Sequence, residues 1–394
     1  MGKIHATKFQ TYVDQAIDRA IIEKRIVGTV VQVAFGGEVI YSRSAGYADR
    51  EQKRTMEENS LFRLASVTKP IVSTAALALV SQGKLNLPDP VTHWLPAFRP
   101  KLPHGQEAQI TIQQLMTHTA GLTYRFFQED QGTYERAGVS DGMDLSEISL
   151  EENLQRLASV PLLYEPGNMW RYSIATDVLG AVIEKVTGMS LREAVQLLVT
   201  HPLHMTDTDF VAVDSNRLTA AYADGSDEPR LLHNELEQVP FIEGTAGFQL
   251  APNRANNTSV YASGGAGMVG SAGDFLTLLE TLRQGGHPIL TNAVATEMAA
   301  NQIGELEMPY WPGRGFGLGF TILKDPVVAG TPESPGTWRM GGTYGHSWFV
   351  DPKEELSVAA FTNTALEGMS GQFTTDICDA IYAGIRESKK TAKI

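Results

Sequence analysis

The chain has 394 residues, which is long enough for one large domain or two coupled lobes around an enclosed active site. Its 45 acidic and 32 basic residues give a formal net charge of −13, and because no basic run could follow a phosphate backbone we expect no nucleic-acid partner. Cys378 is the only cysteine, which excludes an intrachain disulfide and a thiolate metal cluster within one chain.

Residues 1–10 carry lysine, but no continuous apolar stretch or small-residue cleavage pattern follows, so we expect a cytoplasmic protein. No window reaches the roughly 20 apolar residues of a membrane-spanning helix, so we expect a soluble protein without a membrane partner. His201 and His204 have the spacing of metal ligands, but Pro202 lies between them and no third ligand is apparent. We therefore expect neither a metal nor a cofactor, and the sequence leaves the oligomeric state open.

In chain order, helical periodicity comes first, over residues 12–26. Residues 27–35 and 38–45 then form two expected strands that join at Gly36-Gly37. An apolar helix follows from Ser66 to Gly83. The chain therefore opens with a helix, a hairpin and a buried helix.

Residues 85–300 are mainly helical in pattern, and within them the polar residues 223–237 are typical of a surface loop or cleft rim. Strand patterns return after residue 316, and an amphipathic helix closes the chain; these segments are 317–323, 344–350 and 356–362 for the strands and 373–385 for the helix. The N-terminal hairpin and the C-terminal strands would share one antiparallel sheet. We expect an α/β lobe made of residues 1–84 and 301–394, a mainly helical lobe made of residues 85–300, and an active site in the cleft between them.

Ser66 and Lys69 are one helical turn apart, so their side chains share one helix face. A serine hydroxyl needs a neighbouring group to take its proton, and the apolar residues after Lys69 would desolvate that amine and lower its pKa. This pairing predicts acyl transfer. The same four-residue pattern also occurs in exposed helix starts, where the serine is only a cap.

Tyr172 follows a turn at Pro166-Gly167 and precedes a helix. A phenol at such a junction could pass a proton between Ser66 and a leaving group if nearby Lys69 lowered its pKa. It could equally be a half-buried tyrosine beside Trp170. Asp177 could orient the site or merely cap and solvate its helix.

Gly341 and Gly342 precede a strand and would let the backbone approach a substrate closely. The strand edge could then supply an N–H that forms an oxyanion hole together with the N–H of Ser66. An ordinary glycine turn is the alternative. His346 could serve a Ser-His scheme, but a Ser-Lys-Tyr arrangement needs no histidine.

These pieces, in this order, resemble the serine β-lactamase and penicillin-recognising superfamily, and within it the family VIII carboxylesterases related to class C β-lactamases. The resemblance runs nearly end to end and rests on several blocks in order, which are 62–70, 115–122, 172–173, 264–268, 341–342 and 345–351. It implies a β-lactamase/transpeptidase-like fold of the α/β class (α+β type), with an antiparallel sheet flanked by helices and a mainly helical lobe.

The same resemblance implies that Ser66 forms an acyl-enzyme and that Lys69 and Tyr172 move protons. It implies an oxyanion hole formed by the N–H groups of Ser66 and Thr343. The residues expected to bind substrate are Tyr124, Asp177, Met340, Gly341, Gly342 and Trp348, while His118 is expected to hold structure.

Two residues depart from the β-lactamase pattern. Ile174 replaces an Asn, and Met340 replaces the Lys that precedes Thr-Gly. Both changes remove groups that recognise the lactam carboxylate, because methionine cannot make a charge-assisted contact to an anion. We therefore expect a serine carboxylesterase that hydrolyses short-chain acyl esters. The alternatives are an acyltransferase with the same acyl-enzyme, a weak β-lactamase or D-Ala-D-Ala peptidase, and a non-catalytic penicillin-binding-like protein.

Ser140 is a rival nucleophile, because residues 138–142 match the Gly-x-Ser-x-Gly pattern of α/β-hydrolases. That motif needs a buried strand before the serine and a helix after it, whereas the flanking residues here are typical of a polar loop. We therefore assign the nucleophile to Ser66.

Overall fold

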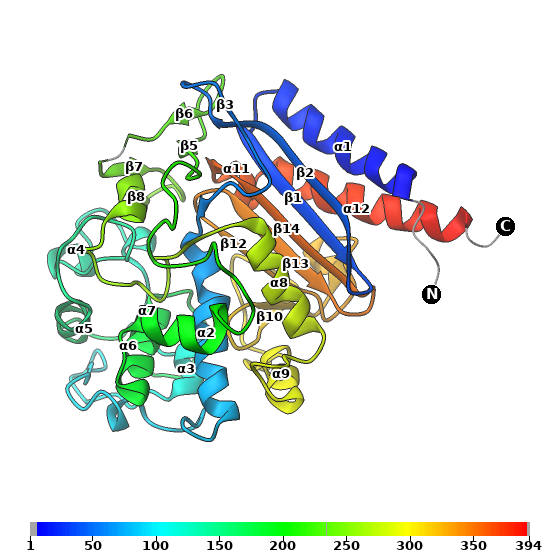
Figure 1. Cartoon of the computed structure of the whole chain (residues 1–394). Coiled ribbons are helices and arrows are strands. Elements are labelled where there is room, and N and C mark those ends of the chain that lie inside the picture. Colours follow the sequence, from blue (N-terminus) through cyan, green and yellow to red (C-terminus); the bar gives the residue numbers. More distant parts are fainter. Residues whose placement is uncertain (1–5, 234, 392–394) are drawn as a thin grey trace.

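The computed structural model describes residues 6–233 and 235–391. The prediction of a cytoplasmic protein rests on residues 1–10, and the first five of these lie outside the described residues. The strands of the main sheet are β1 (Gly28–Phe35), β2 (Glu38–Asp49), β3 (Arg54–Thr55), β10 (Arg314–Phe316), β11 (Thr321–Leu323), β12 (Trp338–Gly342), β13 (His346–Asp351) and β14 (Leu356–Thr362). Within the described residues they form one antiparallel sheet in the order β10-β11-β12-β13-β14-β1-β2-β3 (Figure 1).

The N-terminal hairpin and the C-terminal strands meet in this sheet, as the sequence predicts. Strand β1 pairs with β14 from Thr29 opposite Thr362 to Phe35 opposite Leu356. Alternate residues of β1 point to opposite faces, so Val30 joins the large core while Val31 joins a smaller core under the terminal helices. Both faces of the sheet are therefore covered.

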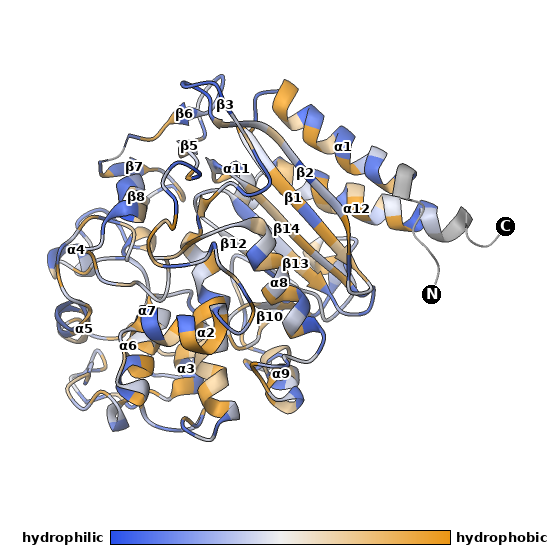
Figure 2. Cartoon of the chain, in the orientation of Figure 1, coloured by the Kyte–Doolittle hydropathy of each residue, from blue (hydrophilic) through white to orange (hydrophobic). Residues whose placement is uncertain are grey.

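Helices α1 (Ala6–Ile22) and α12 (Gln372–Thr391) cover one face, and α8 (Ala272–Arg283) packs against β14 and β1 (Figure 1). Figure 2 shows apolar and polar residues alternating around α1, as expected for a helix with one buried face. Helix α1 ends before residue 26, where the prediction placed its end, because Lys24 adopts a left-handed φ of 56° and turns the chain.

Helix α2 (Thr68–Ser81) is buried over residues 68–79 and lies at the centre of the helical region (Figure 1). The other helices are α3 (Ile112–Met116), α4 (Thr133–Arg136), α5 (Leu150–Ala158), α6 (Ala175–Thr187), α7 (Leu191–Val195), α9 (Asn292–Met298), α10 (Pro326–Ala329) and α11 (Glu367–Ser370). The short strands are β4 (Phe62–Arg63), β5 (Tyr222–Ala223), β6 (Arg230–Leu231), β7 (Glu237–Val239), β8 (Phe248–Leu250), β9 (Val269–Gly270) and β15 (Thr364–Ala365).

Two features refine the predicted organisation. Helix α8 belongs by sequence to the expected helical lobe, yet it packs on the sheet. The expected strand at 317–323 is shortened to β11, because Gly319 has a φ of 121° and turns the chain before Thr321. The boundaries of the two lobes stay a prediction. Among the described residues, none of the helices has the length and apolar character needed to cross a membrane.

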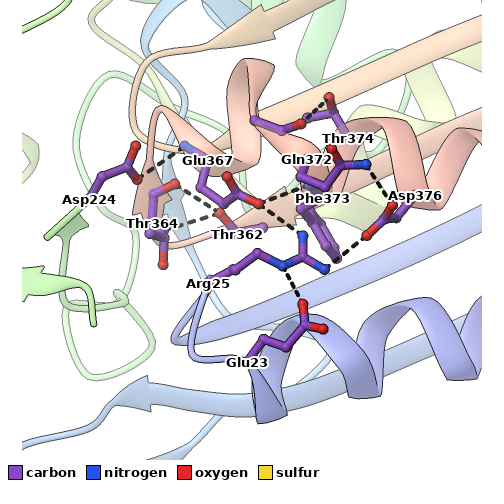
Figure 3. Close-up of polar contacts among 11 residues, drawn as sticks. Glu23, Arg25, Asp224, Thr362, Thr364, Glu367, Gln372, Phe373, Thr374 and Asp376 are labelled. Atoms are coloured by element: carbon purple, nitrogen blue, oxygen red, sulfur yellow. Dashed lines mark hydrogen bonds and ion pairs between the residues drawn. The ribbon is translucent and has the colours of Figure 1, made fainter. Parts of the chain in front are cut away.

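Arg25, just after α1, ties the two ends of the chain together (Figure 3). Its guanidinium donates to Glu23 at 2.9 Å, Glu367 at 3.0 Å and Asp376 at 2.8 Å. Glu367 also accepts from the backbone N–H of Phe373 at 2.9 Å. The start of α11 is therefore fixed against α1 and α12, which positions the residues of α11 that line the cavity described below.

Candidate active site

Ser66 lies in a 3₁₀ turn over Ala65–Val67 that leads directly into α2, so the α-helix begins two residues after Ser66 and not at Ser66 as the sequence predicts. Ala65 has a φ of 45°, a left-handed conformation that costs a non-glycine residue on the order of 1–3 kcal/mol. The turn is fixed by the N–H of Val67, which donates to the carbonyl of Leu64 at 3.0 Å. The strained residue therefore immediately precedes the predicted nucleophile.

The Lys69 amine lies 3.3 Å from Ser66 Oγ and also contacts the Tyr124 hydroxyl and the Gly265 carbonyl oxygen, both at 2.8 Å. Burial lowers the pKa of Lys69 to about 7, although the carboxylates of Asp177 and Asp141 act in the opposite direction. A neutral amine has two N–H donors, which the Tyr124 and Gly265 oxygens can accept, and its lone pair is then free to take the Ser66 proton.

Tyr172 lies three residues before α6, and Lys69 Nζ is 4.6 Å from its ring centroid. Its buried hydroxyl makes no hydrogen bond of ordinary geometry in the described part of the chain, and Ser66 is the side chain near enough to lower its pKa. Burial has the larger effect and raises the pKa of Tyr172 above its usual value. The proton relay expected from the sequence required a lowered pKa of Tyr172, and the structure shows the opposite shift. At neutral pH the phenol is therefore protonated and can donate.

Gly342 allows β12 to lie against the Ser66 turn. A Cβ at this position would lie 2.5 Å from the carbonyl oxygen of Leu64 and 3.1 Å from Cγ2 of Val67, so a side chain would push the strand away. Within the described residues, neither the N–H of Ser66 nor that of Thr343 donates to another protein group. Both donors are available to a substrate oxygen.

Asp177 lies behind Lys69 and is 1% exposed. Its Oδ1 accepts hydrogen bonds from the Ser263 hydroxyl and the Gly265 N–H, both at 2.7 Å, and its Oδ2 accepts one from the Tyr261 hydroxyl at 3.3 Å. Since the carbonyl of Gly265 accepts from Lys69, Asp177 fixes the loop that holds the amine. It does not line the cavity, so its geometry is that of a positioning residue.

The structure also separates Tyr124 and Trp348 from the cavity. Tyr124 is 2% exposed, binds Lys69 and stacks on Phe126 with ring centroids 4.6 Å apart. Trp348 is fully buried against Phe275 and Phe320, with centroids 5.4 and 5.7 Å away. The expectation that these two side chains line the cleft is therefore corrected: Tyr124 supports the lysine, and Trp348 belongs to the core.

A cavity of about 490 Å³ opens at Ser66 and Tyr172, with Met340, Gly341 and Thr343 on its strand side. One wall is aromatic and comprises Phe126, Phe127, Phe241, Phe248, Tyr310 and Trp311. Sequence reasoning missed this wall. Two pairs of adjacent aromatic residues, at 126–127 and 310–311, lie in polar or Pro- and Gly-rich segments of the sequence. They could have indicated a binding site, because ligand pockets are commonly lined by aromatic side chains on loops.

The two histidines near the site are buried and neutral. His118 Nδ1 accepts the N–H of Ser173 at 3.2 Å, and burial lowers the pKa of His118 well below its usual value. His346 Nε2 donates to the carbonyl of Arg63 at 2.7 Å, and burial lowers its pKa to about 4. Neither lines the cavity, and His118 holds the turn that carries Tyr172, as expected for a structural residue.

Ser140 is 2% exposed and lies outside the cavity. Its hydroxyl accepts from the N–H of Gly142 at 3.0 Å, and its own N–H donates to Asn153 at 2.9 Å. This geometry is that of a buried loop rather than of a strand that leads into a helix.

Comparison with known proteins shows the family of this chain. A family model described as Beta-lactamase matches residues 10–376. Esterase EstB from Burkholderia gladioli is 48% identical over 382 residues, which cover 96% of this chain and 97% of EstB. The solved structure of EstCE1, described as a hydrolase with promiscuous acyltransferase activity, matches 96% of this chain and 100% of its own with a TM-score of 0.93 and 46% identity.

A more distant match shows the same fold. Unliganded simvastatin synthase (LovD) from Aspergillus terreus has a TM-score of 0.76 at 21% identity, covering 96% of this chain and 99% of that one. The fold is β-lactamase/transpeptidase-like, with helices around an antiparallel sheet, as the resemblance in the sequence predicted. The chain belongs to the β-lactamase family.

Proposed function

We propose that this protein is a serine carboxylesterase of the family VIII type, which hydrolyses short-chain acyl esters through an acyl-enzyme on Ser66. The observation that carries the proposal is the buried Lys69 amine, 3.3 Å from Ser66 Oγ and with a pKa of about 7. Such an amine is partly neutral at the pH where it must accept a proton. The names of two relatives, an esterase and a hydrolase, support the same assignment.

In the proposed acylation step, Ser66 Oγ attacks the ester carbonyl carbon while its proton passes to Lys69 Nζ. The N–H groups of Ser66 and Thr343 stabilise the oxyanion of the tetrahedral intermediate. When the intermediate collapses, the carbon–oxygen bond of the ester breaks and the leaving alkoxide takes a proton from Tyr172, which Lys69 then reprotonates. The products are the free alcohol and acyl-Ser66.

Deacylation uses the same groups in reverse. Water attacks the acyl carbon, its proton passes to neutral Lys69, either directly or through the Tyr172 hydroxyl, and the bond to Ser66 Oγ breaks as the serine regains a proton from Lys69. The free acid then leaves. Met340 lies in the cavity where the β-lactamase pattern has a lysine, so this position offers no cation for a lactam carboxylate. This supports esters over lactams.

Acyl transfer is the second candidate. The aromatic wall of the cavity disfavours water close to the acyl-enzyme, so an alcohol in the same position could intercept it. EstCE1 is described as having promiscuous acyltransferase activity. From the sequence we also propose a cytoplasmic location and no nucleic-acid partner.

The test is hydrolysis of p-nitrophenyl acetate and butyrate by the wild type, Ser66→Ala and Ser140→Ala. We expect Ser66→Ala to lose at least about 10³-fold in kcat, because removal of a nucleophile leaves only binding and the oxyanion hole. Ser140→Ala is the matched control and should keep its activity. A competing alcohol in the same assay separates hydrolysis from transfer, since transfer yields the new ester.

A further inference from the structure

Besides the nucleophile and the aromatic wall, the cavity has a polar part of its lining, here called the polar branch, made up of Arg314, Thr321, Arg339, Ser347, Ser370 and Thr374. Strand β11 pairs with β12 only at Arg339 and Trp338, so β12 has no partner on that side beyond Arg339. Helix α11, fixed through Glu367 by Arg25 (Figure 3), and the first turn of α12 supply Ser370 and Thr374 to this branch. The positions of these lining residues are therefore fixed by the sheet and by the two helices.

The polar branch carries a net positive charge. Glu333 is fully buried and accepts from Arg339 Nε at 3.0 Å, from Arg314 Nη2 at 3.2 Å and from the Thr331 hydroxyl at 2.7 Å. Burial alone would raise the pKa of Glu333, but the two guanidinium groups outweigh it and lower the pKa, so the carboxylate is ionised. Two guanidinium groups against one carboxylate leave one positive charge without a partner.

Arg339 has the geometry of a carboxylate receptor. Its guanidinium carbon lies 5.1 Å from the ring centroid of Phe349, which fixes the plane of the group, and Glu333 uses only its Nε. In the described part of the chain its two terminal nitrogens have no hydrogen-bond partner, and the side chain is 23% exposed at the cavity. Two adjacent N–H donors with a fixed plane match the two oxygens of a carboxylate.

We propose that the polar branch binds a carboxylate at the far end of the acyl chain, so that the enzyme prefers monoesters of linear dicarboxylic acids over neutral esters of equal chain length. This rests on the proposed esterase function. Arg339 precedes Thr343 by four residues, or about 13 Å of extended strand, and both residues line the cavity. A linear acyl chain of suberate length together with its carboxylate–guanidinium contact is of that order. A neutral chain of the same length would instead bring apolar atoms to the unpaired charge.

The experiment compares kcat/KM for the mono-p-nitrophenyl esters of adipic and suberic acids with p-nitrophenyl hexanoate and octanoate, with the acetate as reference. We expect the suberate monoester to exceed the octanoate by about tenfold, since a hydrogen-bonded ion pair in a partly buried site commonly contributes that factor. Added NaCl should reduce the ratio.

Two variants locate the effect. Arg339→Met should bring the suberate-to-octanoate ratio close to one, and Arg339→Lys should retain part of it because the charge remains without the planar fork. Ser370→Asp places a negative charge at an exposed residue that borders the branch, and it should lower the ratio without disturbing the core. Ser215→Asp is the matched control, because it makes the same charge change at an exposed residue outside the cavity.

Equal kcat/KM for suberate and octanoate in a wild type that still hydrolyses the acetate would overturn the inference and leave the proposed function standing. A ratio that responds equally to Ser370→Asp and Ser215→Asp would also overturn it, because the preference would then come from the general field of the protein. Loss of all ester turnover in the wild type would instead count against the proposed function.

Discussion

Asp177→Asn should move the acid limb of the pH–activity profile toward lower pH. A Cβ at Gly265 would lie 3.4 Å from Asp177 Oδ1 and 3.6 Å from Lys69 Nζ, so these two atoms are at most about 7 Å apart. At an effective dielectric constant of about 20, opposite charges at that distance interact by roughly 2 kcal/mol, or between one and two pKa units. The carboxylate thus holds the pKa of Lys69 up, and removing its charge lets that pKa fall.

The asparagine keeps the shape and most of the contacts, because its oxygen can accept from Ser263 and Gly265 and its amide can donate to Tyr261. The assay is kcat/KM for p-nitrophenyl acetate between pH 5 and 9. We expect the midpoint of the acid limb to fall by about one to two pH units, with KM little changed. An unchanged midpoint together with a raised KM would refute this reasoning and favour Asp177 as a substrate-binding residue.

Lys69→Met should abolish ester hydrolysis yet raise the melting temperature. Burial holds the pKa of Lys69 at about 7 in the folded protein, below its unfolded value of 10.5, so protonated Lys69 lowers the free energy of unfolding by up to about 5 kcal/mol below pH 7. The stabilisation by methionine should therefore shrink as pH rises from 7 toward 10.5. A Lys69→Met variant that is less stable than the wild type at pH 6 would count against the assignment. Gly342→Ala should reduce kcat at least about 10²-fold by moving the Thr343 N–H away from Ser66. Gly273→Ala on α8, where a Cβ meets only the Gln32 side chain at 3.5 Å, is its control, and equal activity of the two variants would contradict the role of Gly342.

The parts of the site that depend on local spacing could be predicted from the sequence. Ser66 and Lys69 are brought together by one helical turn, and that relation survives although Ser66 lies in a 3₁₀ turn. Tyr172 joins them because a short segment runs from its turn into α6. The sheet could be anticipated because β1, β2 and β14 have clear strand patterns.

The parts of the site that depend on burial and on contacts between distant segments could not be predicted from the sequence. Trp348 pairs with Met340 across β12 and β13, yet its ring lies in the core between Phe275 and Phe320, which alternation alone does not reveal. The direction of the Tyr172 pKa shift depends on how completely the phenol is buried.

The aromatic wall shows the same limit. Phe127 and Tyr310 stack with ring centroids 5.7 Å apart although 182 positions separate them in the sequence. No pattern in one sequence connects two loops at that separation, so the shape of the cavity required the structure.

The central claim, that Ser66 is the nucleophile, is tested most directly by treating the protein with a fluorophosphonate and measuring the intact mass, followed by peptide mapping. The reagent transfers its phosphonyl group to an activated serine with loss of fluoride. We predict one adduct per chain, located at Ser66, present in Ser140→Ala and absent in Ser66→Ala. An adduct that persists in Ser66→Ala, or an active wild type labelled only at another residue, would contradict the account.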